Sequence, residues 1–182
     1  TGIAICYIIK KWVGLNKRIE WLLVDICESF IVIASFVLGW LYQLNNKYII
    51  GLNDVLSDRL KYIAQTMSTY NIKLWGQYIE EHGNGGSIIA KDNYFFIDNS
   101  FVRCMYEYGA IVFVLVIVLI FMAQKKMLDN EKYIMCLAFF IVTIASFAEH
   151  HLLEIAYNPF IFSVFACMSN NDKVIMEEKR IC

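Results

Sequence analysis

The run from Gly109 to Met122 (GAIVFVLVIVLIFM) contains no charged residue and no strongly polar one. A helix that crosses the hydrocarbon core of a bilayer needs about 20 predominantly apolar residues. The stretch from Val102 to Ala123 around this run reaches that length. A helix at the surface of a soluble domain would instead carry polar residues along one face. This segment therefore predicts a membrane-spanning helix.

The composition of the 182-residue chain fits a protein that lies largely in a membrane. Hydrophobic residues make up 59% and charged residues 18% of the chain, whereas soluble domains have about 25% charged residues. The net charge of −1, from 16 basic and 17 acidic residues, creates no overall field that points to nucleic acid. The six cysteines show no CxxC or zinc-type spacing. We therefore expect no disulfide framework, no metal site and no cofactor.

Three further apolar stretches predict membrane spans. They run from Ile19 to Tyr42, from Tyr133 to Ala148 and from Ile155 to Met168. Tryptophan and tyrosine at both ends of the first stretch are typical of interfacial anchors. With Val102 to Ala123, these stretches predict an all-α, polytopic transmembrane protein with about four spans in this chain.

The start of the chain predicts that membrane segments precede it. The chain begins with Thr1 and has no signal-peptide pattern. The apolar residues Thr1 to Ile9 run into Lys10 and Lys11, as the end of an earlier span would. We interpret residues 1–18 as the end of that span and a cytoplasmic loop, and the chain as the C-terminal part of a longer protein.

The basic residues of the short loops predict the orientation of the spans, because such loops are usually cytoplasmic. These residues are Lys10, Lys11, Lys17, Arg18, Lys125, Lys126 and Lys132. The loop 124–132 and the tail 169–182 should then lie inside, whereas the turn 149–154 and the long loop 43–101 should lie outside.

The long outer loop is predicted to be partly helical and to carry the function, because loops of this length are seldom passive connectors. Asn53 and Asp54 can cap a helix that runs to about Thr69. One face of this helix is apolar, so a helix lying on the membrane surface is an alternative. The glycine-rich stretch from His82 to Gly86 predicts a turn, and no GK[ST] sequence makes it a phosphate loop.

The polar residues that precede the span at Val102 allow two interpretations. Asp98, Asn99 and Ser100 could cap a helix, or Asp98 could stand at the mouth of a catalytic cavity beside a helix N-terminus. Arg103 and Glu107 share a helical face and could form either a buried structural pair or a substrate-binding pair.

Other charged residues also have a structural and a functional interpretation. Asp25 and Glu28 could line a polar channel, or the first span could begin beyond Asp25. A surface arginine is the ordinary explanation of Arg59. The spacing of His150 and Glu154 could hold a divalent cation, but we favour an interfacial turn because water is near.

Four segments together resemble a known family. They are LNDVLSDRL (52–60), KLWGQ (73–77), IDNSFVRCMYEYGAIVF (97–113) and AEHHLLEIAYNPF (148–160). In this order and spacing they resemble the late outer loop and following span of Wzy-type polymerases of O-antigen and capsular polysaccharide, which belong to the superfamily of O-antigen ligases. One position departs from the family pattern, since Asp58 stands where glycine is usual. The resemblance covers about two thirds of the chain.

The resemblance implies a function, a location and a set of site residues. The enzyme would join oligosaccharide repeat units carried on polyprenyl pyrophosphate into O-antigen, capsule or exopolysaccharide, at the outer face of the bacterial cytoplasmic membrane. Arg59 would stabilise the leaving pyrophosphate and Asp98 would act as the base. The substrate would be held by further residues, namely Arg103, Glu107, Asn99 and Tyr94. A flippase and a chain-length regulator would be candidate partners.

Three other functions stay open at this stage. The chain could transfer glycan as an O-antigen ligase does. It could be a transporter or flippase of the same lipid-linked units, in which charges within the spans line a path. It could also be a membrane sensor or assembly factor without catalysis, in which case Arg59 and Asp98 would be dispensable.

Overall fold

The computed structural model describes residues 17–82, 94–154, 158, 159 and 162, and this part of the chain is mostly helical and without a strand. The helices are α2 (Lys17–Gln43), α3 (Lys47–Val55), α4 (Arg59–Thr69), α5 (Ser100–Arg103), α6 (Ala110–Asp129) and α7 (Tyr133–Ala145). A π-helical turn covers Cys104–Tyr108, and a 3-10 turn covers His151–Leu153. The all-helical class predicted from the sequence is confirmed for these residues.

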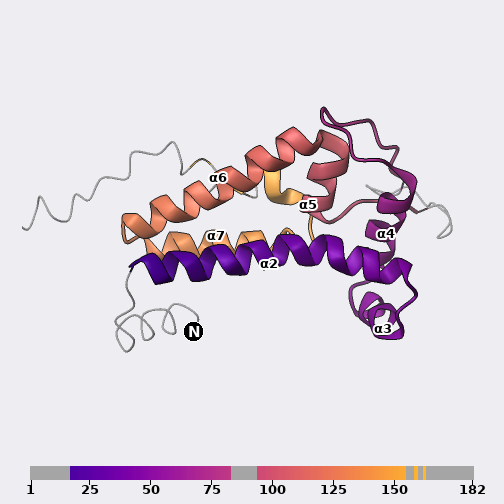
Figure 1. Ribbon diagram of the computed structural model, residues 1–182, viewed down its shortest axis with the longest axis horizontal. Coiled ribbons are helices and arrows are strands. Elements are labelled where there is room, and N and C mark those ends of the chain that lie inside the picture. The colour runs from indigo at the N-terminus through magenta and orange to yellow at the C-terminus, as the bar shows by residue number, and fades with distance from the viewer. Residues whose placement is uncertain (1–16, 83–93, 155–157, 160–161, 163–182) are drawn as a thin grey trace, which may run out of the picture.

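The longest helices, α2 and α6, form the shaft of the molecule, with α7 between them (Figure 1). Trp21–Gln43 within α2 and Ala110–Asp129 are both long and apolar enough to cross a membrane. At 13 residues, α7 reaches about 20 Å along its axis, less than the hydrocarbon core of a bilayer. Two candidate spans are thus present in the described part of the chain.

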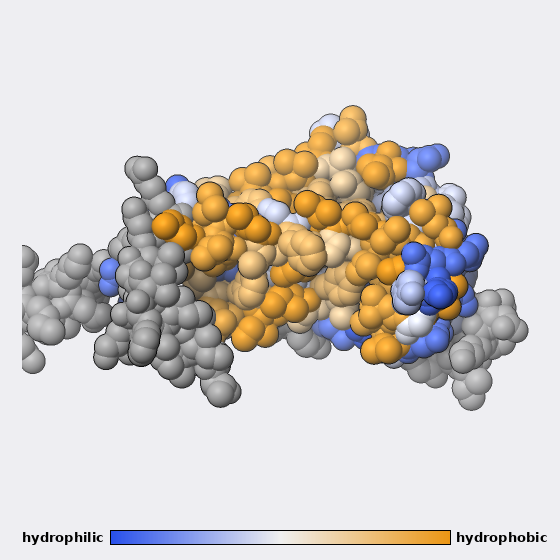
Figure 2. Space-filling view, turned by 60° about the horizontal axis from the view of Figure 1, so that its bottom comes forward, coloured by the Kyte–Doolittle hydropathy of each residue, from blue (hydrophilic) through white to orange (hydrophobic). Residues whose placement is uncertain are grey.

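Apolar surface dominates the shaft, whereas polar residues gather mainly at the end that carries α3 and α4 (Figure 2). The exposed side chains of α2 include a stripe of large apolar residues at helical spacing, namely Ile26, Phe30, Ile33 and Val37. Burying such side chains is favourable by about 1.5–3 kcal/mol each. This surface fits contact with lipid or with other helices better than contact with water.

A polar junction links the three shaft helices inside the apolar core. Glu28 of α2 is fully buried, and its carboxyl group accepts a hydrogen bond of 2.6 Å from the Gln124 amide of α6. The Gln124 carbonyl in turn lies 2.9 Å from the thiol of Cys136 on α7. Asp25 is only partly buried. Of the two acidic residues in the first span, Glu28 is therefore the one that faces the helix bundle.

The predicted boundaries of the helix from Val102 to Ala123 are wrong. The chain turns through α5 and the π-helical turn, and Gly109, with φ of 98°, separates both from α6. The long helix runs instead from Ala110 to Asp129. Hydropathy did not reveal the break, because the immediate neighbours of Gly109, Tyr108 and Ala110, are aromatic and apolar. Arg103 and Glu107 consequently lie outside the candidate span.

The single loop helix predicted from Asn53 to Thr69 is two helices. Ser57 and Asp58 both have positive φ, which ends α3 and redirects the chain before α4 begins. The residue that caps α3 is Asn46, whose side chain accepts a hydrogen bond from the amide of Tyr48. The predicted end at Thr69 is correct.

The remaining boundaries differ from the structure to various degrees or fall outside it, and the loop predicted at 124–132 is shortened to 130–132 because α6 runs to Asp129. The first predicted span, 19–42, lies within α2, and the third begins at Tyr133 as expected but ends at Ala145. The predicted span 155–168 and the segments 1–16 and 169–182 lie largely or wholly outside the described residues.

Two glycines in left-handed conformations hold the outer loop against the start of α6. Gly76 has φ of 81°, and its backbone contacts Gly109, where a Cβ atom would lie 2.3 Å from the Gly76 nitrogen. This contact lets the carbonyls of Lys73 and Leu74 accept hydrogen bonds from the first two amides of α6, at 3.0 and 3.3 Å. The loop thereby caps the helix.

Replacing Gly109 with alanine should destabilise the protein. The backbone conformation there is accessible almost only to glycine, so strain costs about 1–3 kcal/mol, and the clash with Gly76 adds to it. Thermal denaturation of the detergent-extracted protein would measure the loss. The control is Gly51→Ala on α3, where a Cβ meets nothing within 4 Å. Equal melting temperatures for the two variants would contradict this packing.

Candidate functional site

Hydrogen bonds join the segment 98–101 to the turn that follows α7. The Asn99 amide donates to the carbonyl of Phe147 at 2.8 Å, and the Ser100 amide donates to the carbonyl of Ser146 at 2.9 Å. The Ser100 hydroxyl donates to the Glu149 carbonyl and accepts from the amide of Leu152. Two segments about 50 positions apart therefore form one unit near the start of α6 (Figure 1).

Asn99 is buried and acts as a helix cap. Its side-chain oxygen accepts hydrogen bonds from the amides of Phe101 and Val102, at 3.0 and 2.9 Å. Its side chain is thus engaged by backbone groups on both sides. The capping interpretation of the sequence is the one that the structure supports for this residue, and its expected contact with substrate is not tested.

The break between α3 and α4 positions Arg59. Asp58 adopts the left-handed conformation, with φ of 65°, which aspartate tolerates better than most residues. The Asn53 side chain donates to the Asp58 carboxylate at 2.8 Å and accepts from the amide of Lys61 at 3.0 Å. Asp58 thus adopts a conformation that glycine would reach freely.

Arg59 meets two carboxylates from distant parts of the sequence. Its Nε atom lies 3.6 Å from the carboxylate of Asp98, and its terminal nitrogen donates to Glu149 at 3.2 Å. We call these three residues the Arg59 cluster. Their side chains are 29%, 22% and 47% exposed, respectively. An anion in solution can therefore reach the guanidinium.

Burial is the main cause of the pKa shifts of the groups next to Arg59. Burial raises the pKa of Asp98, and the charge of Arg59 opposes this rise. Burial also raises the pKa of Tyr94, with a further contribution from Asp98, so the phenol keeps its proton. The Tyr94 ring packs against Tyr62 of α4, with ring centroids 5.3 Å apart. Tyr94 therefore borders the Arg59 cluster.

Arg103 belongs to a second cluster, in which its guanidinium contacts other groups of the protein. Glu81 accepts two hydrogen bonds from the guanidinium, at 2.5 and 2.7 Å, and the carbonyl of Ile97 accepts a third at 3.0 Å. The carboxylate of Glu107 lies 3.7 Å away. The Phe96 ring covers the guanidinium at 4.8 Å. The structure thus favours the structural interpretation of the Arg103 and Glu107 pair.

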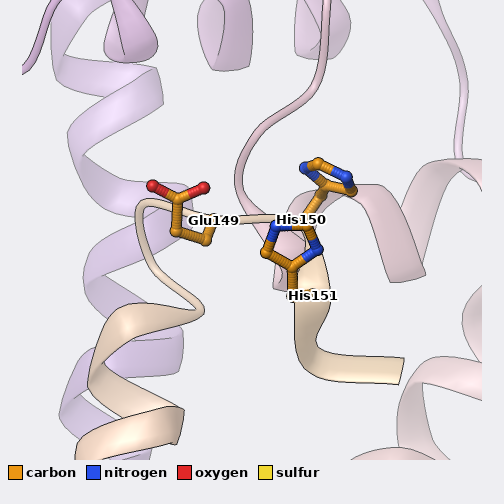
Figure 3. A group of neighbouring side chains, drawn as sticks. All are labelled: Glu149, His150 and His151. Carbon is orange, nitrogen blue, oxygen red and sulfur yellow. The ribbon is translucent and has the colours of Figure 1, made fainter. Parts of the chain in front are cut away.

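The turn after α7 carries two adjacent imidazoles. The rings of His150 and His151 have centroids 4.1 Å apart, and His150 also packs edge-on against Phe96. Figure 3 shows the two imidazole rings next to each other, with the Glu149 side chain beside them. Burial and the neighbouring His151 lower the pKa of His150, which favours its neutral form.

Sequence reasoning missed two acidic residues that organise these clusters. Glu81 follows no motif, and its partner Arg103 lies 22 positions away, so no local signal could reveal the pair. Glu149 stood out only as part of a polar turn, and its contact with Arg59 spans 90 positions.

Comparison with protein-family models, curated proteins and solved structures finds no match for this chain.

Removing the Glu81 carboxylate should loosen the segment before α5. Glu81→Ala leaves the largely buried Arg103 without its main partner and the amide of Ile97 without its acceptor, at a cost of about 1–3 kcal/mol. Hydrogen exchange at Ile97 and thermal denaturation would measure the effect. Glu80→Ala is the matched control, because this neighbouring carboxylate is exposed and lies 3.8 Å from the ring of His82. Equal exchange rates in the two variants would refute the role of Glu81.

Proposed function

We propose that this chain belongs to a membrane-embedded glycosyltransferase that polymerises oligosaccharide repeat units carried on polyprenyl pyrophosphate. The observation that carries the proposal is the Arg59 cluster. Its members come from LSDRL, IDNS and AEHH, three of the four segments in which the sequence resembles Wzy-type polymerases. Nothing in hydropathy or helical periodicity requires these three segments to meet. Their meeting in one exposed polar site supports a shared function.

The fourth segment, KLWGQ, packs against the segment that contains Glu107 and Gly109. The KLWGQ segment supplies Gly76, which packs against Gly109 of the EYG sequence, and Gln77, whose amide donates to the Glu107 carbonyl at 2.9 Å. The motif glycines thus have a structural reason, because each needs a positive φ and a close backbone neighbour. The four resembling segments therefore contact one another, and most of their residues lie outside the candidate spans.

The chemistry requires a cation and a base, and the Arg59 cluster contains a candidate for each. Asp98 accepts the proton of the acceptor sugar's hydroxyl, whose oxygen then bonds to the anomeric carbon of the donor glycan. The bond between that carbon and the pyrophosphate oxygen breaks, and the pyrophosphate leaves with the bonding electrons. Arg59 stabilises the charge on the leaving group through its planar set of donors. No nucleotide is needed, because pyrophosphate is already a good leaving group.

The remaining candidates differ in how well their contacts suit a role in binding. Tyr94 lies beside the cluster and presents an aromatic ring of the kind that stacks on sugars. Arg103 is held by Glu81, by the Ile97 carbonyl and by Glu107, so we assign Arg103 and Glu107 support of the Asp98 segment. Asn99 is assigned the same supporting part.

The proposed location is the outer face of the bacterial cytoplasmic membrane. The Arg59 cluster lies at the end of the molecule where α6 begins (Figure 1). Lys125 and Lys126 lie near the opposite end of α6, and Lys132 follows in the next loop. Basic residues favour the cytoplasmic side, so the cluster would face outward, where lipid-linked repeat units are delivered. A flippase and a chain-length regulator would then be functional partners.

Replacing Arg59 should abolish polymerisation. In a strain whose only copy of the gene carries Arg59→Ala, the surface-glycan ladder should collapse to single repeat units, a rate loss of about 100-fold or more. Arg59→Lys should also lower the rate, because a lysine cannot offer the same planar pair of donors. The control is Lys61→Ala, which removes an exposed cation from the same helix.

Membrane abundance, checked by immunoblot, separates loss of activity from loss of protein. Long chains in the Arg59→Ala strain at normal abundance would reject the catalytic role of Arg59. If deletion of the whole gene also left long chains, the polymerase function itself would fail. Accumulation of repeat units on the cytoplasmic side after deletion would favour a flippase.

A further inference from the structure

We propose that His150, His151 and Glu154 form a binding site for a divalent transition-metal ion of the zinc type. The carboxylate oxygen Oε1 of Glu154 lies 3.4 Å from Nε2 of His150 and 3.1 Å from Nδ1 of His151. Two imidazole nitrogens thus converge on a single carboxylate oxygen. This inference does not depend on the proposed polymerase activity.

The spacing of these atoms suits tetrahedral coordination. Nitrogen and oxygen ligands lie about 2.1 Å from zinc, which places two tetrahedral ligands about 3.4 Å apart. The two measured separations from Glu154 Oε1 are within a few tenths of an ångström of this value. Two histidines with one glutamate, and a fourth position open to water or substrate, make a known zinc ligand set.

The backbone of the turn holds the three ligands in place. The Leu152 amide donates to the hydroxyl of Ser100 at 3.2 Å, and the side-chain amide of Asn158 donates to the carbonyl of Leu152 at 2.9 Å. The amide of Asn158 donates to the Glu154 carbonyl at 2.8 Å. Leu152 itself is fully buried. A metal would therefore meet ligands whose backbone is already ordered, which lowers the entropy lost on binding.

The three side chains are partly exposed, whereas the Nδ1 atom of His151 is itself buried. The side chains of His150, His151 and Glu154 are 20%, 28% and 45% exposed. Beneath them, the ring of Phe96 packs edge-on against His150 with centroids 5.1 Å apart, so one side of the site is apolar. An ion bound there would be partly shielded from water.

Glu154 is a better ligand than Glu149. Glu149, His150 and His151 can each place one ligand atom within 4.8 Å of the others. The Glu149 carboxylate, however, accepts a hydrogen bond from Arg59 at 3.2 Å, and that positive charge competes with a metal ion. Figure 3 shows the Glu149 side chain beside the paired imidazoles. The sequence favoured a plain interfacial turn here, and the convergence of both imidazoles on Glu154 is what the sequence could not show.

Cobalt binding tests the proposal directly. The protein would be purified in detergent without a polyhistidine tag and titrated with Co²⁺, whose visible absorption bands are intense in tetrahedral sites. We expect one equivalent of Co²⁺ to bind with these bands, and Zn²⁺ to displace it. His150→Gln, His151→Gln and Glu154→Gln should each weaken binding by about tenfold or more. His82→Gln is the control, because it removes the third histidine of the chain from outside the site.

Each outcome of this titration decides the question. Absence of saturable Co²⁺ binding by the unmodified protein would overturn the proposal. So would unchanged binding in all three site variants, or a loss in His82→Gln equal to theirs. Thermal denaturation of each variant identifies any that fails to fold, and the two remaining ligands then carry the test. Because metal binding is measured without glycan synthesis, failure here leaves the polymerase proposal standing, and the reverse also holds.

Discussion

The hydrogen bonds between residues 99–100 and the turn after α7 are the interaction on which the candidate site depends. Asn99 and Ser100 donate to the carbonyls of Phe147, Ser146 and Glu149. These bonds fix Asp98 beside Glu149, and both carboxylates then share Arg59 at the start of α4. Without them the three charges would belong to three separate loops. The polar backbone of a short, irregular segment, more than the apolar shaft, brings the site together.

The shaft supplies a rigid support for that segment. Gly39 of α2 lies so close to α4 that a Cβ there would approach Ile63 to 2.3 Å, and Gly76 and Gly109 make a similarly close contact at the start of α6. Gly39 makes room for the side chains of α4, whereas Gly76 and Gly109 let two backbone segments approach each other. The Arg59 cluster and the His150–Glu154 turn lie next to each other on this support. A metal in that turn would add positive charge near the Arg59 cluster, where an anionic substrate would be held.

Long apolar segments were the predictable part of this fold. The helix predicted from Ile19 to Tyr42 lies within α2 to within two residues at each end, because most of its residues are apolar. The breaks were not predictable in the same way. Asp58 and Ser57 adopt positive φ although neither is glycine, and Gly109 interrupts a run that hydropathy sees as continuous. Likewise, the roles expected of Arg59 and Asp98 rested on family resemblance, their contact was not predicted, and the contact of Arg103 with Glu81 had no local signal at all. Side-chain contacts between distant segments depend on backbone turns that sequence periodicity does not encode.

The central claim, that Arg59 and Asp98 act as one unit, is tested most directly by a double-mutant cycle on polymer synthesis. Rates would be compared in membranes containing the unmodified protein, Arg59→Ala, Asp98→Asn and the double variant at matched abundance. If the two residues serve the same step, the double variant should be little worse than the poorer single variant, because effects within one catalytic unit are not additive. Losses that simply multiply would show that the two residues act independently and would contradict the account.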